Sequence, residues 1–174
     1  IVLLVLFLVL QACKKESEYD KLPPITTTGE NTFACLINGE YWSYVEPYWG
    51  EGMIASLSDL GISIAGWNNE ETIHIYINKD SATYWNINTP IKYKLINNSY
   101  LVGKYQKEYS ASEYFTNESY GCIGEIEFLN IDTTNRIISG TFWFDAVNIE
   151  GKKIEIREGR FDIDNLGYFP KHIY

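Results

Sequence analysis

The chain has 174 residues and a formal net charge of −9 at pH 7. This length fits one ordinary domain with its own hydrophobic core. The excess of acid repels phosphate groups, which argues against nucleic acid as a partner and against docking of the domain face on anionic lipid headgroups. Aromatic residues make up 16% of the chain, with 14 Tyr and 5 Trp, and such a composition suits β-strands better than helices.

Residues 1–10 are all apolar. A run of this length is too short for a bilayer core, which needs about 20 residues, and is typical of a secretory signal. The sequence Leu10-Gln11-Ala12-Cys13 resembles the lipobox of bacterial lipoproteins, in which a small residue precedes a lipidated cysteine. We therefore expect residues 1–12 to be a signal peptide and Cys13 to carry the lipid that joins the protein to a membrane. The alternatives are a buried N-terminal element and an unmodified cysteine.

Residues 14–31 are first charged and then rich in Pro, Thr and Gly, with little to bury. Such a composition is typical of a spacer. The sequence therefore predicts a lipidated cysteine and flexible tether over residues 13–31.

Short runs of alternating apolar and polar residues begin at Thr32 and continue through the predicted β domain, residues 32–174. Ile73, Ile75 and Ile77 alternate with polar neighbours, and Asn38-Gly39 is typical of a hairpin turn. The number and spacing of the runs predict an all-β fold, an antiparallel β-sandwich of about nine strands, with a lipocalin-like β-barrel as the alternative. Residues 97–120 fit a long loop, a short helix or irregular edge strands.

Cys35 and Cys122 remain after lipidation of Cys13. Two thiols in an oxidising compartment favour one disulfide, so we expect them to be bridged. The alternative is two separately buried free thiols.

The sequence gives no catalytic, cofactor or metal site, so we expect a protein that is not an enzyme. It contains two His, at positions 74 and 172, too few for a zinc site of His ligands. Neither lies beside a Gly-x-Ser-x-Gly turn. Its 23 acids offer many carboxylate pairs but nominate none for glycoside hydrolysis.

Aromatic residues gather in polar, turn-like surroundings and are the candidate ligand-facing residues. Flat rings beside amide groups suit the stacking and hydrogen bonding of a sugar. The same rings also suit a sandwich core, so both interpretations stay open. The four tryptophans concerned are Trp42, Trp49, Trp67 and Trp85.

Three segments at the two ends of the domain are distinctive: LPPITTTGENTFACLINGEYW at 22–42, ISGTFWFDA at 138–146 and EGRFDI at 158–163. They resemble a family of small uncharacterised lipoproteins from Bacteroidota. The resemblance implies an outer-membrane lipoprotein, periplasmic or surface-exposed, and assigns no activity. We expect a non-catalytic β domain with a binding or structural role, a glycan or an envelope protein being its partner. The alternative is a carbohydrate-binding or carbohydrate-active accessory lipoprotein.

Overall fold

The computed structural model describes residues 17–45, 52–58, 60–78, 89–97, 101–107 and 112–169. No helix within these ranges is long and apolar enough to cross a membrane. The described elements are η1 (Glu18–Lys21), β1 (Thr32–Ile37), β2 (Glu40–Ser43), β3 (Met53–Ser58), β4 (Gly61–Trp67), β5 (Glu71–Asn78), β6 (Ile91–Leu95), β7 (Leu101–Lys107), β8 (Glu113–Phe115), η2 (Glu118–Tyr120), β9 (Gly124–Asp132), β10 (Ile137–Val147), β11 (Lys153–Ile163) and β12 (Leu166–Phe169).

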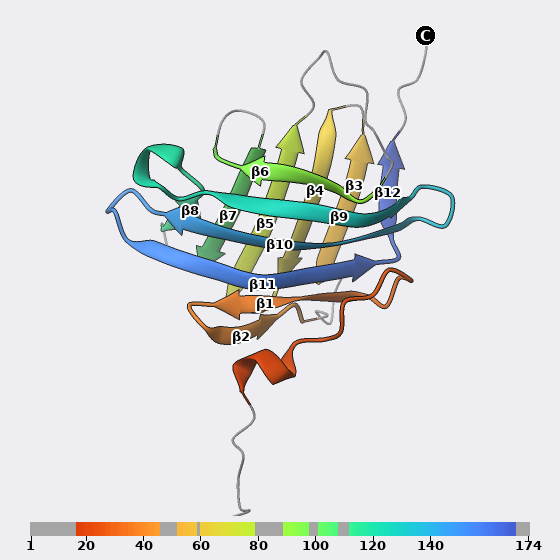
Figure 1. Ribbon diagram of the computed structural model, residues 1–174, viewed down its shortest axis with the longest axis horizontal. Helices are drawn as coiled ribbons and strands as arrows, with labels where there is room; N and C mark the ends of the chain where they lie inside the picture. Colours follow the sequence, from red (N-terminus) through yellow and green to blue (C-terminus); the bar gives the residue numbers. More distant parts are fainter. Residues whose placement is uncertain are drawn as a thin grey trace, which may run out of the picture.

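The strands form one sheet that is folded over into two layers (Figure 1). The front layer has the order β6-β9-β10-β11-β1-β2, and the rear layer has the order β12-β3-β4-β5-β7-β8. The layers join where Val147 of β10 pairs with Phe115 of β8. Strands of the two layers cross at a steep angle, and β12 against β3 is a parallel pair in this otherwise antiparallel arrangement. The all-β prediction is confirmed, with an architecture between a sandwich and an open barrel.

The described residues contain twelve strands, more than the nine or so predicted. The strands missed from sequence are β7, β8 and β12. Two of these are only three and four residues long, too short for an alternating pattern to be visible. Within the region left open at 97–120, the described parts are two strands and the short helix η2.

The core fills the space between the two layers. Ile73, Ile75 and Ile77 are buried as their alternation predicts. Burial of each such side chain stabilises the fold by roughly 1.5–3 kcal/mol. Glycines of the rear layer make room for aromatic rings of the front layer: a Cβ on Gly103 would lie 2.9 Å from the ring of Phe144. The front layer contributes a cluster of contacting rings, Phe33, Phe128, Phe142 and Phe161.

The β1–β2 hairpin forms as its sequence predicts. Asn38 and Gly39 have positive φ angles of 50° and 86°. Two-residue hairpin turns of the favoured type require positive φ at both positions, which Asn-Gly adopts at low cost. This turn brings β2 to the edge of the front layer.

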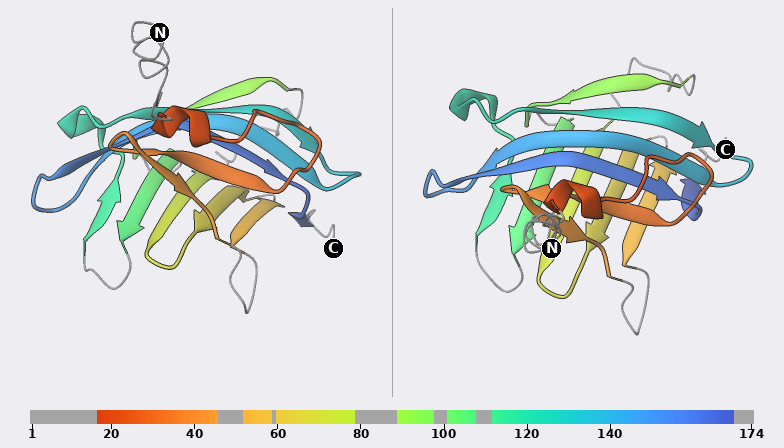
Figure 2. Two further views of the ribbon diagram at one scale, coloured as in Figure 1. Left: turned by 90° about the horizontal axis from the view of Figure 1, so that it is seen from below. Right: turned by 60° about the horizontal axis from the view of Figure 1, so that its bottom comes forward.

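Residues 17–31 differ from the flexible tether predicted for them. They begin with the capped helix η1 and then follow the outer face of the front layer as an ordered segment, here called the strap (Figure 2). Backbone groups of the strap bond to side chains of β11 and β9. The polar composition is compatible with this because hydrogen bonds, rather than apolar burial, hold the segment. Residues 1–16, including Cys13, lie outside the described residues.

Candidate functional site

A pocket of about 520 Å³ lies at one end of the two layers and is called the mouth pocket here. Its front wall comes from the β1–β2 hairpin and the start of β11, and its rear wall from β5, β7 and β8. Its volume lies within the range of sites for small ligands. The mouth pocket is lined by Ile37, Asn38, Glu40, Tyr41, Trp42, Glu71, Tyr105, Lys107, Ser112, Tyr114, Lys152 and Ile154.

Three buried aromatic residues form the floor of the mouth pocket. Trp42, Tyr105 and Tyr114 are 4–6% exposed. The Tyr105 and Tyr114 rings meet edge to face at 5.5 Å, and Trp42 packs edge-on against Phe33 at 5.9 Å. The indole N–H of Trp42 has no acceptor among the described residues. The floor is therefore an apolar surface continuous with the core and fixed by ring packing.

A carboxylate and a phenol are joined at the rear wall. The Tyr105 hydroxyl donates to Glu71 Oε1 at 2.7 Å. Burial, followed by this hydrogen bond and the charge of Glu71, raises the pKa of Tyr105 above its ordinary value. Burial and then the charge of Glu71 likewise raise the pKa of the Cys35 thiol. Glu71 therefore places negative charge beside the floor, and its neighbours stay protonated at neutral pH.

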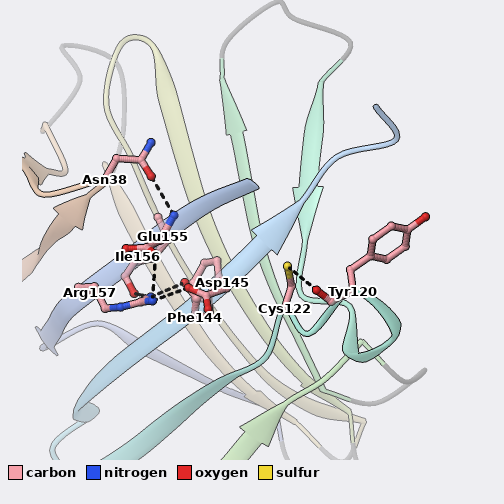
Figure 3. Close-up of polar contacts among 8 residues, drawn as sticks. All are labelled: Asn38, Tyr120, Cys122, Phe144, Asp145, Glu155, Ile156 and Arg157. Atoms are coloured by element: carbon pink, nitrogen blue, oxygen red, sulfur yellow. Dashed lines mark hydrogen bonds and ion pairs between the residues drawn. The ribbon is translucent and has the colours of Figure 1, made fainter. Parts of the chain in front are cut away.

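The rim carries charges of both signs, with Glu40 on the front wall and Lys107 on the rear wall. Asn38 sits on the hairpin turn and is fixed to β11, because its backbone N–H donates to Glu155 O at 2.8 Å and its Oδ1 accepts from Glu155 N at 2.9 Å (Figure 3). A rigid rim with amide, hydroxyl and charged groups can hydrogen-bond a polar ligand whose ring stacks on an aromatic side chain.

The predicted ligand-facing tryptophans are not brought together in the described structure. Trp42 reaches the mouth pocket, but as a buried residue of its floor rather than as an exposed platform. Trp67 lies at the end of β4, partly exposed and outside this pocket. Trp49 and Trp85 lie outside the described residues. Sequence reasoning missed Tyr105 and Tyr114, because their strands lie in the region that showed no clear pattern.

The predicted disulfide is not formed, and this expectation is corrected: Cys35 and Cys122 are both buried free thiols. Cys35 lies on β1, whereas Cys122 precedes β9, and its Sγ lies 3.8 Å from the Tyr120 carbonyl oxygen (Figure 3). Three strand spacings, from β9 through β10 and β11 to β1, separate these elements by about 14 Å. A disulfide needs Cα atoms within about 7 Å, so the topology keeps the thiols apart.

The fold and the mouth pocket together define a two-layered all-β domain with a small-ligand-sized pocket at one end. The chain belongs to the family described as a domain of unknown function (DUF6252), which matches residues 31–162. No curated protein and no solved structure matches the chain. The family match begins where the strap ends, so most of the strap lies outside it.

Proposed function

We propose that this chain is a cell-envelope lipoprotein of the outer membrane, periplasmic or surface-exposed, with a lipid on Cys13 and a non-catalytic binding domain. The anchoring part is supported by the apolar run at 1–10 and by the small Ala12 before Cys13. The binding part is supported by the mouth pocket. The single observation on which the binding proposal depends is that the mouth pocket has an aromatic floor beneath a polar rim with both positive and negative charges.

A carbohydrate is the ligand class that the mouth pocket favours. Tyr41 is half-buried at the rim, where a sugar face could stack on its ring, and Asn38 and Glu40 supply hydrogen-bonding groups beside it. The rim offers Glu40 and Glu71 against Lys107 and Lys152, so neither a polyanion nor a polycation is selected. An uncharged polyol fits this balance best.

The rear wall of the mouth pocket supports binding of a ligand without turnover. Glycoside hydrolysis uses two carboxylates on either side of the scissile bond. Glu71 is already the acceptor of the Tyr105 hydroxyl at 2.7 Å, which suits a positioned binding group. The alternative, a carbohydrate-active accessory protein, would use Glu40 and Glu71 as its carboxylates.

A glycan array followed by titration calorimetry tests the binding proposal. We expect Tyr41→Ala to weaken the binding of an array hit by about tenfold, because ring stacking is lost. Tyr76→Ala is the matched control, since Tyr76 is also half-buried on a strand but lies outside the mouth pocket. Absence of any glycan ligand, or equal loss in both variants, would contradict carbohydrate binding there. Glycan cleavage abolished by Glu71→Gln would instead favour the enzyme alternative.

Mass spectrometry of the mature protein tests the anchor. We expect an N-terminal peptide that begins at Cys13 and carries acyl chains. Cys13→Ala should release the protein from the membrane fraction. A mature chain that retains residues 1–12 without lipid would contradict the anchor and leave the binding proposal untouched.

A further inference from the structure

Two charged side chains of β11 are buried although they lie on the face of the strand that points away from the core. Phe161 and Ile163 point into the core, so Arg160 and Asp162 lie on the outer face of the front layer. They are nevertheless only 8% and 0% exposed. The strap covers them, and without it both charged groups would face water.

The strap satisfies these side chains with its backbone. The Asp162 carboxylate accepts from three consecutive backbone N–H groups, those of Thr28 at 3.0 Å, Gly29 at 2.9 Å and Glu30 at 3.1 Å. Arg160 donates to the Pro23 carbonyl oxygen at 3.0 Å. Hydrogen bonds to charged groups are stronger than neutral ones, so the strap is firmly held.

The first residues of the strap are tied to the edge of the front layer. η1 is capped by Ser17, and Glu18 Oε2 accepts from the Tyr41 backbone N–H of β2 at 3.0 Å. The Arg160 guanidinium lies 5.7 Å from the centre of the Tyr19 ring. The described part of the chain therefore begins at Ser17, with η1 beside β2 (Figure 2) and hydrogen-bonded to Tyr41, a residue of the mouth pocket.

We propose that the η1–β2 end of the domain faces the lipid bilayer and is held close to it. This inference rests on the proposed lipidation of Cys13. Four residue steps separate Cys13 from Ser17, a reach of at most about 14 Å, whereas nineteen steps to Thr32 would reach about 65 Å. A docked strap thus replaces a long tether with a short one. The surface that this end of the domain faces is the membrane, and the mouth pocket opens near that surface.

Hydrogen exchange on the purified full chain tests the strap without involving the lipid. We expect the amides of Thr28, Gly29 and Glu30 to be protected, and Asp162→Asn to speed their exchange by about tenfold or more. Asp164→Asn is the matched control. Asp164 directly follows β11, is exposed, and bonds the strap through its backbone N–H, which donates to Asn31 Oδ1, rather than through its carboxylate. Unprotected amides in the unaltered chain would overturn the docked strap.

Energy transfer on vesicles tests the orientation. A donor dye is placed at Glu40→Cys beside η1, or at Leu60→Cys, and the vesicles, made of the uncharged lipids phosphatidylethanolamine and phosphatidylcholine, carry acceptor lipids. The start of β4, next to Leu60, lies at the far side of the molecule from η1 in Figure 1. We expect strong transfer from position 40, weak transfer from position 60, and loss of this difference in Asp162→Asn. Equal transfer from both positions with an intact strap would overturn the proposal.

Coupling to a maleimide lipid separates this inference from the proposed function. If the native chain carries no lipid and does not bind vesicles, the Cys13 thiol is joined to a maleimide lipid. In this arm the dye is attached through an azide-bearing amino acid at position 40 or 60 instead of a cysteine, so that the maleimide is directed to Cys13, and the two dye positions are compared again. A position-dependent signal then supports the orientation while the anchor fails. Equal signals overturn the orientation whatever the native state of Cys13.

Discussion

The Asp162 carboxylate lies 2.9 Å from the backbone nitrogen of Gly29, although 133 residues of sequence separate them. Gly29 has a φ of 84°, a conformation that glycine adopts without strain. Its N–H and those of its two neighbours converge on one carboxylate. This contact closes the strap onto β11 and links the beginning of the described chain to its C-terminal part.

The first prediction concerns this contact. Asp162→Asn keeps the side-chain shape but replaces a charged acceptor with an amide whose NH₂ group faces backbone donors. We expect the free energy of unfolding to fall by about 1–3 kcal/mol in urea titrations. Asp164→Asn should change it by less than about 0.5 kcal/mol, as is usual at exposed sites. Equal effects of the two substitutions would remove the special role of Asp162.

The second prediction concerns the thiols. Since Cys35 and Cys122 are free and separated by the strand order, we expect identical thermal melts with and without reductant. Mass spectrometry under denaturing, non-reducing conditions should find both thiols open to alkylation. A mass lower by two hydrogen atoms, together with a melt that drops on reduction, would show a bridge and refute the separation.

The third prediction concerns alkaline pH. Burial and then Glu71 raise the pKa of the Cys35 thiol in the folded state, so the unfolded chain ionises first as pH rises. The free energy of unfolding is unaffected by this group below about pH 8 and should fall above about pH 9, by up to about 1.4 kcal/mol per pH unit. Tyr105 adds to the fall above about pH 10, because its pKa is also raised, first by burial. In urea titrations repeated across this pH range, the free energy of unfolding should fall less steeply with pH in Cys35→Ala than in the unaltered chain. The same dependence on pH in both chains would count against the buried thiol.

The fourth prediction concerns acid pH. His74 lies on the outer face of β5, with Nε2 2.8 Å from Ser63 Oγ. Burial, and then the charge of Lys104, lower the pKa of His74. As pH falls below about 6.5, the unfolded chain takes up a proton before the folded one, so stability present above that pH is lost below it. His74→Gln should reduce this loss in melts between about pH 7 and about pH 4.5. Lys104→Met should make this loss of stability smaller, because removing the charge of Lys104 brings the pKa of folded His74 closer to that of the unfolded chain.

The fifth prediction separates Trp42 from Trp67, two of the tryptophans predicted to face a ligand. Trp42 is buried against Phe33, so Trp42→Ala should cost about 3–5 kcal/mol of unfolding free energy. Trp67 is partly exposed at the end of β4, and Trp67→Ala should cost less than half as much. The two variants are compared by urea titration with the same probe. A larger loss at Trp67 would contradict the placement of Trp42 in the core.

Local sequence predicted the strands whose pattern is long enough to read. Ile73, Ile75 and Ile77 alternate with polar residues and are buried, and Asn38-Gly39 makes its hairpin turn. These features depend on side-chain alternation and on backbone angles within a few residues. β8 showed no such signal, because three residues are too few for a period of two to emerge.

The candidate site was only partly predictable. Trp42 was singled out, but its orientation depends on which face of β2 meets the core. Tyr105 and Tyr114 reach the mouth pocket because β7 and β8 pair with each other beside β5, a register that no local pattern contains.

The sequence by itself determined an all-β fold whose strands begin near Thr32, because alternation and turn chemistry are local properties of the chain. Only the tertiary structure decided three further features: the separation of Cys35 from Cys122, the assembly of the mouth pocket, and the docking of the strap on Arg160 and Asp162. Each of these features depends on how segments far apart in sequence are placed relative to one another, as in the pairing of β1 with β11. Patterns within a few neighbouring residues do not specify that placement.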